Sequence, residues 1–300
     1  MRLTAIVPAT DAPAQLERCV AAIHAADDAP DEVIVVDTAP LPGPAAARNV
    51  GAERARGEVL VFVDSDVLPH PDAFRRIRDA FSSDPGLSAI FGSYDDTPEA
   101  PGAVSAFRNL LHHFVHQQSA GEATTFWAGL GAVRCEAFTR AGGFDAARYP
   151  TSSIEDIELG MRMAASGARM RLDPALQGTH LKRWTLASMI RTDLHGRGVP
   201  WVALLASENA APTGLNLGWR HRLSAAASIA LVSSLATRRP RHAALAAGAL
   251  VALNAQFYAL LAKRRGPAEA TLGVGLHALH HLTGACAVPL GLLAHARERD

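Results

Sequence analysis

Residues 32–66 of the chain read EVIVVDTAPLPGPAAARNVGAERARGEVLVFVDSD. The stretch contains two continuous apolar, β-branched runs, Glu32–Asp37 and Glu58–Val63, which are typical of parallel strands covered on both faces. Between them, Pro42–Ala55 begins with proline–glycine turn chemistry and continues with a helical pattern. The stretch therefore predicts a strand–helix–strand unit whose last strand ends on Asp64-Ser65-Asp66.

The same alternation of strand and helix continues on both sides of this unit. Strands are expected over Leu3–Pro8 and Ser88–Phe91, and helices over Gln15–Ala26 and Pro71–Phe81. This order predicts an α/β fold, with a Rossmann-like, mostly parallel sheet and helices on both of its faces. Ligands of such sheets bind at the carboxyl ends of the strands. Three aspartates are expected there: Asp37, Asp64 and Asp66.

The composition excludes several classes of protein. The 300 residues carry 29 Lys and Arg against 29 Asp and Glu, so no nucleic-acid partner is expected. With 49% hydrophobic and 19% charged residues, the chain is not disordered as a whole. Its three cysteines, Cys19, Cys135 and Cys286, are far apart, which argues against a disulfide framework.

The C-terminal part of the chain has a different composition. Residues 216–300 contain ten Lys and Arg against three Asp and Glu, and they include the apolar segments Leu223–Thr237, Ala243–Ala262 and Ala270–Ala294. The last two segments are long enough to cross a hydrocarbon core of about 30 Å. A soluble, alanine-rich helical bundle is the alternative. We expect a catalytic domain over residues 1–215 and, after it, a helical membrane anchor with two or three hydrophobic segments.

Residues 185–210 join these two parts and have an amphipathic pattern, which Pro200 is expected to interrupt. They predict either a surface helix packed on the core or interfacial helices that lie among lipid headgroups. The N-terminal MRLTAIVPAT is read as a buried first strand and not as a signal peptide. We therefore expect the catalytic domain at the cytoplasmic side of the cell membrane.

Four blocks of sequence resemble the inverting family 2 glycosyltransferases, which have the GT-A fold. They are VPAT at residues 7–10, the GP-x-x-ARN-x-G, ARGE and F-x-D-x-D string over Gly43–Asp66, FWAGLGAVRCEAFTRAGGFD over Phe126–Asp145 and SSIEDIELGMRMAASG over Ser152–Gly167. The blocks follow the order of that family and span roughly residues 1–185. The resemblance implies transfer of a sugar from a nucleotide-diphosphate donor.

The resemblance also implies a role for each matching residue. Positions that match the family's nucleotide contacts are Pro8, Ala9, Asp37, Arg48 and Asp64. Of these, the first three match contacts to the nucleobase, and Asp64 matches the residue near the ribose. Asp66 matches the ligand of a Mg²⁺ or Mn²⁺ ion that bridges to the diphosphate, which suits the preference of these ions for carboxylate and phosphate oxygens.

Glu155 and Asp156 match the family's acidic pair, which opens a helix beneath the acceptor site. Inverting transfer needs a base that takes the proton of the acceptor hydroxyl, and a carboxylate within hydrogen-bond reach can do so. We expect Asp156 to be that base, with Glu155 supporting it. The alternative is that both residues only stabilise the N-terminal end of the helix dipole.

The run His180-Leu181-Lys182-Arg183-Trp184 resembles the Gln-x-x-Arg-Trp motif of membrane-embedded family 2 synthases, with His in place of Gln. The resemblance implies that Arg183 steadies the diphosphate and that Trp184 forms a floor for the acceptor. A His in this region also completes the metal shell in many non-processive members of the family. His180 thus has two interpretations, and we prefer the metal ligand.

Trp127 is expected to contact the acceptor, with a core aromatic as the alternative. Two histidine groups on expected helices, His112/His113/His116 and His277/His280/His281, have spacings that could hold zinc, but we expect no metal there. A nucleotidyltransferase and a dinucleotide-dependent oxidoreductase are excluded because their glycine-rich loops are missing.

The expected function is therefore inverting glycosyl transfer to a membrane-associated, lipid-linked acceptor, such as a polyprenyl phosphate or a growing glycolipid, in the synthesis of cell-envelope glycans or glycolipids. A catalytically inactive, membrane-tethered scaffold that binds nucleotide sugars or a partner synthase is the alternative.

Overall fold

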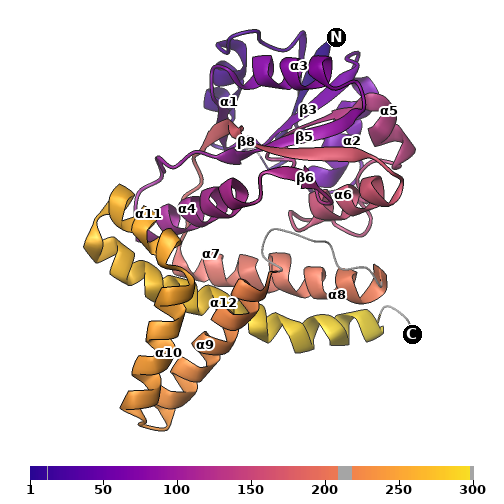
Figure 1. Cartoon of the computed structure of the whole chain (residues 1–300). Coiled ribbons are helices and arrows are strands. Elements are labelled where there is room, and N and C mark those ends of the chain that lie inside the picture. Colours follow the sequence, from indigo (N-terminus) through magenta and orange to yellow (C-terminus); the bar gives the residue numbers. More distant parts are fainter. Residues whose placement is uncertain (12, 209–217, 298–300) are drawn as a thin grey trace. The chain divides into compact units, whose positions relative to one another are not determined.

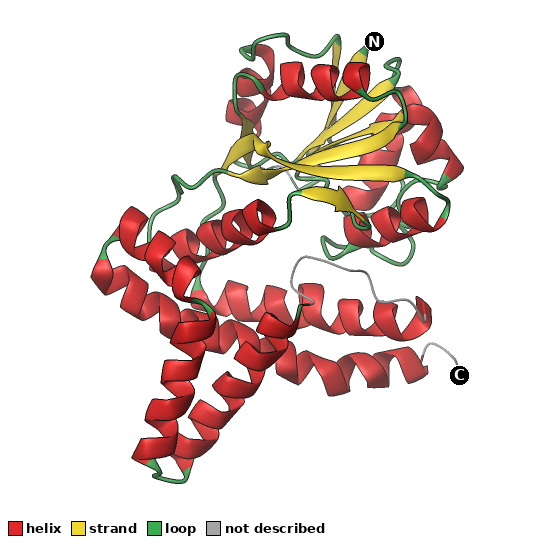
Figure 2. Ribbon diagram, in the orientation of Figure 1, coloured by secondary structure: helices red, strands yellow, loops and turns green. Residues whose placement is uncertain are grey.

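The structure is a computed structural model, and its described residues are 1–11, 13–208 and 218–297. The chain forms two compact units (Figures 1 and 2). The first comprises Met1–Glu99 and His116–Lys182, and the second comprises Ala100–Val115 and Arg183–Asp300. The chain thus enters the second unit at residue 100, returns to the first at residue 116 and passes into the second again at residue 183. The domain boundary expected after residue 215 and the end of the interfacial segment expected to reach residue 210 lie outside the described residues.

The first unit is built on an eight-stranded sheet in the order β2-β1-β3-β7-β5-β8-β4, with β6 paired to β8 outside this path. Its strands are β1 (Leu3–Pro8), β2 (Glu32–Val36), β3 (Val59–Val63), β4 (Val67–Pro69), β5 (Leu87–Tyr94), β6 (Gly121–Ala123), β7 (Leu130–Arg134) and β8 (Arg169–His180). The expected strands over residues 3–8, 32–37, 58–63 and 88–91 are all confirmed. The sequence did not predict β4, β6, β7 or β8.

The sheet is mixed and not mostly parallel, which corrects that part of the prediction. Strand β1 is parallel to β2 and β3, and β5 is parallel to β8. Strand β7 is antiparallel to both β3 and β5, and β4 and β6 are antiparallel to β8. The parallel part follows from the early β-α-β units. The strands β4, β6 and β7 run antiparallel to their neighbours. The predicted α/β class is confirmed.

Helices cover both faces of this sheet, because alternate residues of a strand point to opposite sides. Ala5 and Val7 of β1 belong to a core cluster with residues of α1 (Leu16–His24) and α3 (Ala73–Ser83). On the other face, Ile6 packs against α2 (Pro44–Arg54), where a Cβ on Gly51 would overlap its side chain. The helices α5 (Cys135–Arg140) and α6 (Glu155–Ala165) complete the unit (Figure 1).

The second unit is helical. Its elements are most of α4 (Ala103–Gln118), α7 (Leu186–Arg191), the π-helical segment η1 (Thr192–Gly198), α8 (Val199–Glu208), α9 (Trp219–Ala236), α10 (Pro240–Leu253), α11 (Ala255–Arg265) and α12 (Pro267–Arg297). A cluster of buried apolar residues from α4, α7, α11 and α12, including Phe107, Met189 and Phe257, forms its core.

One local expectation in this unit is wrong, and one apolar segment is bent. Pro200 does not interrupt the helix, because it lies in the first turn of α8, and the wider turns of η1 precede it without a break in the helical chain. The apolar segment Ala243–Ala262 is not one helix, because α10 and α11 meet at Asn254 with a bend of 77°. The Asn254 amide donates to the carbonyl of Leu250 at 2.9 Å, and this side-chain bond competes with the helical ladder.

Among the described residues, α12 is the one single helix that is long and apolar enough to cross a membrane. The bent pair α10 and α11 passes the same test only if both are counted as one span. Length and composition therefore give one candidate span, or at most two, where the sequence predicts two or three hydrophobic segments. A largely buried helix of a soluble protein can meet the same criterion.

Candidate functional site

The predicted nucleobase contacts lie at the carboxyl ends of β1 and β2. Pro8 is opposite Val36 in the parallel register, and the backbone N–H of Ala9 donates to the carbonyl of Val36 at 2.8 Å. Asp37 follows directly and is exposed, whereas Pro8 and Ala9 are buried. Since β1 is also parallel to β3, these three residues lie at the same sheet edge as Asp64.

The Asp64-Ser65-Asp66 segment forms the connection between β3 and β4. The carbonyl of Asp64 accepts from the N–H of Val67 at 2.9 Å, which closes the turn. On β8, His180 pairs with Val67, and the N–H of Leu181 donates to the carbonyl of Asp66 at 2.8 Å. The short strand β4 is therefore what brings the end of β8 to the aspartate turn.

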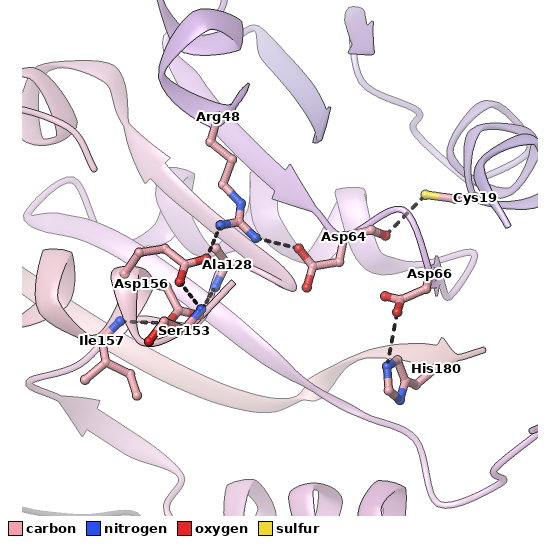
Figure 3. A network of polar contacts seen from close by, with 10 residues as sticks. Cys19, Arg48, Asp64, Asp66, Ala128, Ser153, Asp156, Ile157 and His180 are labelled. Atoms are coloured by element: carbon pink, nitrogen blue, oxygen red, sulfur yellow. Dashed lines mark hydrogen bonds and ion pairs between the residues drawn. The ribbon is translucent and has the colours of Figure 1, made fainter. Parts of the chain in front are cut away.

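Asp66 and His180 face each other as a result (Figure 3). The Nε2 atom of His180 lies 3.6 Å from Oδ2 of Asp66, too far for a hydrogen bond but close enough for an ion pair. Burial opposes ionisation of Asp66, but the adjacent His180 and the Lys182 ammonium hold its pKa below the ordinary value. This ionised carboxylate beside an imidazole is the geometry that the metal-ligand interpretation of His180 requires.

The ring of His180 is held by an aromatic neighbour. Tyr94, the last residue of β5, stacks on it with ring centroids 4.1 Å apart and an angle of 8° between the planes. Trp127 in turn packs edge-on against Tyr94 at 5.0 Å and against His116 at 5.5 Å. Trp127 is half-buried within this cluster, so both interpretations of it, acceptor contact and packing, remain.

Arg48 connects the aspartate turn to Glu155, the neighbour of the predicted base Asp156. It is 4% exposed and forms ion pairs with Oδ1 of Asp64 at 2.6 Å and with Oε1 of Glu155 at 2.9 Å (Figure 3). Burial opposes its charge, but the carboxylates of Asp64, Glu155 and Asp156 raise the pKa of Arg48 above its ordinary value. Arg48 thus links two acidic sites, and its predicted approach to the phosphates stays a prediction.

Glu155 and Asp156 begin helix α6, as predicted. Glu155 is buried and accepts from the N–H of Ser153 at 2.8 Å. Asp156 is half-buried, and its Oδ2 accepts from the N–H of Ala128 at 3.1 Å (Figure 3). Helix α6 approaches this loop closely, because a Cβ on Gly160 would overlap the backbone nitrogen of Phe126. The half-buried carboxylate of Asp156 suits a base, and its place in the first helical turn also fits the dipole interpretation.

Arg183 and Trp184 belong to the second unit. Arg183 is exposed. Trp184 is half-buried, its backbone N–H donates to Oγ of Ser105 at 2.9 Å, and the Arg108 guanidinium lies 4.9 Å from the centre of its ring. A buried ion pair at 2.7 Å connects Arg108 to Asp193. Trp184 is thus fixed within its own unit by α4.

Three residues beside the aspartate turn were not among the predicted site residues. Tyr94 gave only a weak signal, as a residue at a strand end, and Lys182 could have been noticed as one of two lysines in the chain. Cys19 of α1 gave no signal: its thiol donates to the carbonyl of Asp64 at 3.5 Å, and burial together with Asp64 and Asp66 raises its pKa to about 12. The thiol is therefore neutral at this site.

The sequence matches a known family and two curated relatives. Residues 59–259 match the family described as glycosyl transferase family group 2. The pre-mycofactocin glycosyltransferases of two Mycobacterium tuberculosis strains, CDC 1551 / Oshkosh and ATCC 25618 / H37Rv, are 27% identical over 183 residues. This alignment covers 59% of the chain but only 38% of each relative, so the chain spans well under half of their length.

Two solved structures share the fold over the whole chain. The mannosyltransferase PcManGT from Pyrobaculum calidifontis, in complex with GDP-Man and Mn²⁺, is 19% identical with a TM-score of 0.54, and 88% of it is covered. Residues 1–349 of S. aureus TarS, in complex with UDP-GlcNAc, are 15% identical with a TM-score of 0.50, and 92% of that chain is covered. At these identities the likeness concerns the fold alone.

Proposed function

Because this chain belongs to glycosyl transferase family group 2, and is therefore a glycosyltransferase, we propose that it moves a sugar with inversion from a nucleotide-diphosphate donor to an acceptor presented at a membrane. One observation carries the proposal. The turn at Asp64-Ser65-Asp66 has His180 on one side and, through Arg48, the acidic start of α6 on the other. Donor, metal and base functions thus have candidate residues at one sheet edge.

The donor is proposed to bind across the ends of β1, β2 and β3. Pro8, Ala9 and Asp37 would contact the nucleobase, and Asp64 the ribose. The fold neighbours bind GDP-Man and UDP-GlcNAc, which supports a guanine or uracil nucleotide as the donor of this chain. The Arg48 guanidinium holds the Asp64 carboxylate in a fixed orientation toward the donor.

A divalent metal ion, Mg²⁺ or Mn²⁺, fits the residues present. In the described part of the chain no three His, Cys, Asp or Glu side chains converge as a metal site, whereas Asp66 and His180 form a pair. Two protein ligands suit an ion that takes its remaining ligands from phosphate and water. The PcManGT complex holds Mn²⁺, which supports this assignment. The ion would neutralise charge on the departing diphosphate.

Asp156 is proposed as the general base. Its Oδ2 accepts from the N–H of Ala128 and Oδ1 from the N–H of Ile157, so the carboxylate is oriented by two backbone donors. From this position it would take the proton of the acceptor hydroxyl as that oxygen attacks the anomeric carbon. Glu155, which forms an ion pair with Arg48, would support the start of α6.

The acceptor is proposed to be lipid-linked, with the catalytic unit at the cytoplasmic side of the membrane. The basic and apolar composition of residues 216–300 supports a site close to a bilayer. Trp127 and Trp184 would provide aromatic surfaces for the acceptor, and the exposed Arg183 a cation for its phosphates or for the donor diphosphate.

Calorimetric titration with UDP and with GDP, each with and without Mn²⁺, tests the donor and metal assignments. We expect metal-dependent binding of one nucleotide, and its loss in Asp66→Ala. Asp84→Ala is a matched control, because Asp84 has a similar side-chain exposure, 29% against 27%, and its own ion pair with Arg169. Equal loss in both variants, or tight binding without metal, would contradict the assignment.

Transfer itself is tested with the labelled sugar of the nucleotide that binds. Incubation with membranes should move the label into material that organic solvent extracts, and Asp156→Asn should slow this transfer by about 10²–10⁴. Label that accumulates only in water-soluble product would refute the lipid acceptor. Metal-dependent binding without any transfer, under conditions that support related enzymes, would identify the chain as a scaffold.

A further inference from the structure

Helices α9 and α10 form an antiparallel helical hairpin over Trp219–Leu253, named the α9–α10 hairpin below (Figure 1). Three hydrogen-bonding side chains of this region point inward, while Ser233 and His242 are exposed. Ser224 and Ser228 of α9 are fully buried, and Asn254, at the end of α10, is 2% exposed. The Asn254 amide donates to Oγ of Ser224 at 2.9 Å, and the Ser228 hydroxyl donates to the carbonyl of Ser224 at 2.8 Å.

Large apolar side chains point outward from the same hairpin. The exposed ones are Leu223, Ile229, Val232 and Leu235 on α9 and Leu245 and Val251 on α10, with exposed fractions between 41% and 74%. The buried residues of α10 are Ala243, Ala246 and one large apolar residue, Leu250. Polar groups and small residues inside, with most of the large apolar side chains outside, is the arrangement of helices packed in lipid. A water-soluble hairpin has the opposite arrangement.

The charge of this region indicates which lipid headgroups it would contact. No Asp or Glu occurs between Glu208 and Glu269. The basic residues of the hairpin stand at its two ends: Arg220 and Arg222 at the start of α9, and Arg238, Arg239 and Arg241 at the turn. The three arginines of the turn are exposed. A wholly basic, apolar surface is complementary to anionic phospholipid headgroups.

The length of the hairpin decides how deeply it inserts. The uncharged part of α9, Leu223–Ala236, has 14 residues, or about 21 Å of helix, which is shorter than a hydrocarbon core of about 30 Å. A crossing hairpin would therefore carry the arginines of its turn into the hydrocarbon, at a cost of several kcal/mol each. Lying along one leaflet, it keeps both basic ends at the headgroups.

We propose that the α9–α10 hairpin is an interfacial membrane anchor, which lies in one leaflet of a bilayer rich in anionic phospholipid and binds its phosphates through Arg238, Arg239 and Arg241. This inference rests on the membrane-presented acceptor of the proposed function and specifies how the chain reaches that surface. It assigns a lipid contact to a hairpin that is too short to span.

Flotation of the full-length protein with vesicles tests the anchor. We expect binding to vesicles of phosphatidylcholine with phosphatidylserine, and much weaker binding to phosphatidylcholine alone. Combined replacement of Arg238, Arg239 and Arg241 by Gln should lower the affinity for anionic vesicles on the order of a hundredfold and change the affinity for neutral vesicles little. Leu245→Glu should lower the affinity for both vesicles roughly tenfold.

Leu41→Glu is the matched control, because Leu41 is an exposed leucine of the first unit, and its replacement should leave vesicle binding unchanged. In a Cys135→Ser, Cys286→Ser background, which removes the accessible native thiols, Thr237→Cys next to the turn should react with a membrane-impermeant maleimide added on the side of the protein. Protection of that cysteine would show that the hairpin crosses the bilayer and would overturn the one-leaflet placement.

Unchanged vesicle binding in the Leu245 and arginine variants would refute the anchor itself. A stable lipid-free dimer that Leu245→Glu dissociates would assign the apolar surface to a second copy of the chain, which would also refute it. Far-UV circular dichroism checks that each variant is folded. Metal-dependent nucleotide binding, measured on the same preparations, reports on the proposed function separately, so the two hypotheses can fail independently.

Discussion

Replacing Arg48 by methionine should destabilise the protein by about 3–5 kcal/mol, because it leaves a buried carboxylate without its counter-charge. Glu155 is 3% exposed, and its Oε1 atom has the Arg48 guanidinium at 2.9 Å. The second ion pair of Arg48, with the half-exposed Asp64, adds less because water reaches that carboxylate. Methionine keeps most of the apolar packing that Arg48 makes against Phe144, so the change reports mainly on charge.

The assay is urea unfolding at pH 7, followed by far-UV circular dichroism, for four proteins: wild type, Arg48→Met, Glu155→Gln and the double variant. In the double variant the buried charge is gone, so the two costs should not add, and the coupling should be about 2 kcal/mol or more. Arg169→Met is the matched control. Arg169 pairs with Asp84 at the surface, and its loss should cost less than about 1 kcal/mol.

The reasoning is refuted if Arg48→Met costs no more than Arg169→Met. It is also refuted if Glu155→Gln costs the same with and without Arg48, because the two side chains would then contribute independently.

Three further predictions concern single side chains. Tyr94→Leu should weaken Mn²⁺ binding, measured by paramagnetic resonance with the bound nucleotide, by roughly two- to tenfold, while Tyr94→Phe, which keeps the stack on His180, should not. Asp156→Asn should lower kcat by about 10²–10⁴ and leave the calorimetric affinity for the nucleotide unchanged, whereas an equal loss of affinity would contradict a base. Asp95→Asn should lower the free energy of unfolding in urea at pH 7, and it should lower it less as the pH falls below about 3.9. Burial raises the pKa of Asp95, but bonds from His70, Thr179 and Thr97 lower it more. Its stabilisation is therefore present above the unfolded pKa of about 3.9 and is lost as pH falls through the lower folded pKa. A constant difference across this range would contradict that assignment.

The first strands of the sheet could be predicted because their signals are local. The apolar runs at residues 3–8, 32–37 and 58–63 are all strands, and the aspartates at their ends lie at one sheet edge. The start of α6 at Glu155 was predicted in the same way, from a block of residues contiguous in the chain. Local pattern suffices where an element is a continuous apolar run or begins with a recognisable block. It does not give the burial, because β2 is an edge strand with Val35 exposed, where the sequence predicted a strand covered on both faces.

The contacts that complete the site could not be predicted, because they join residues far apart in the chain. His180 reaches Asp66 only through the pairing of β4 with β8, and β4 is three residues long and gives no periodic signal. The stack of Tyr94 on His180 likewise depends on the parallel pairing of β5 with β8. Arg48 was placed near phosphates by resemblance, and its two carboxylate partners became visible only when α2, β3 and α6 were brought together.

Hydropathy does not predict which helix contacts lipid, for a related reason. It counts the apolar side chains of a segment but does not say whether they face solvent or the interior of the protein. It selects α12, which nevertheless buries His277 against Tyr258 at 3.0 Å, and whose His280 contacts the buried Asp193 at 2.8 Å. These polar contacts make that stretch of α12 part of the interior of the second unit. In the α9–α10 hairpin, α10 meets the criterion only together with α11, and α9 does not meet it, yet the outer surface of the hairpin is apolar and its interior holds Ser224 and Ser228. Which helix meets lipid therefore depends on the direction of its side chains, and by this measure the hairpin is a candidate that hydropathy alone passes over.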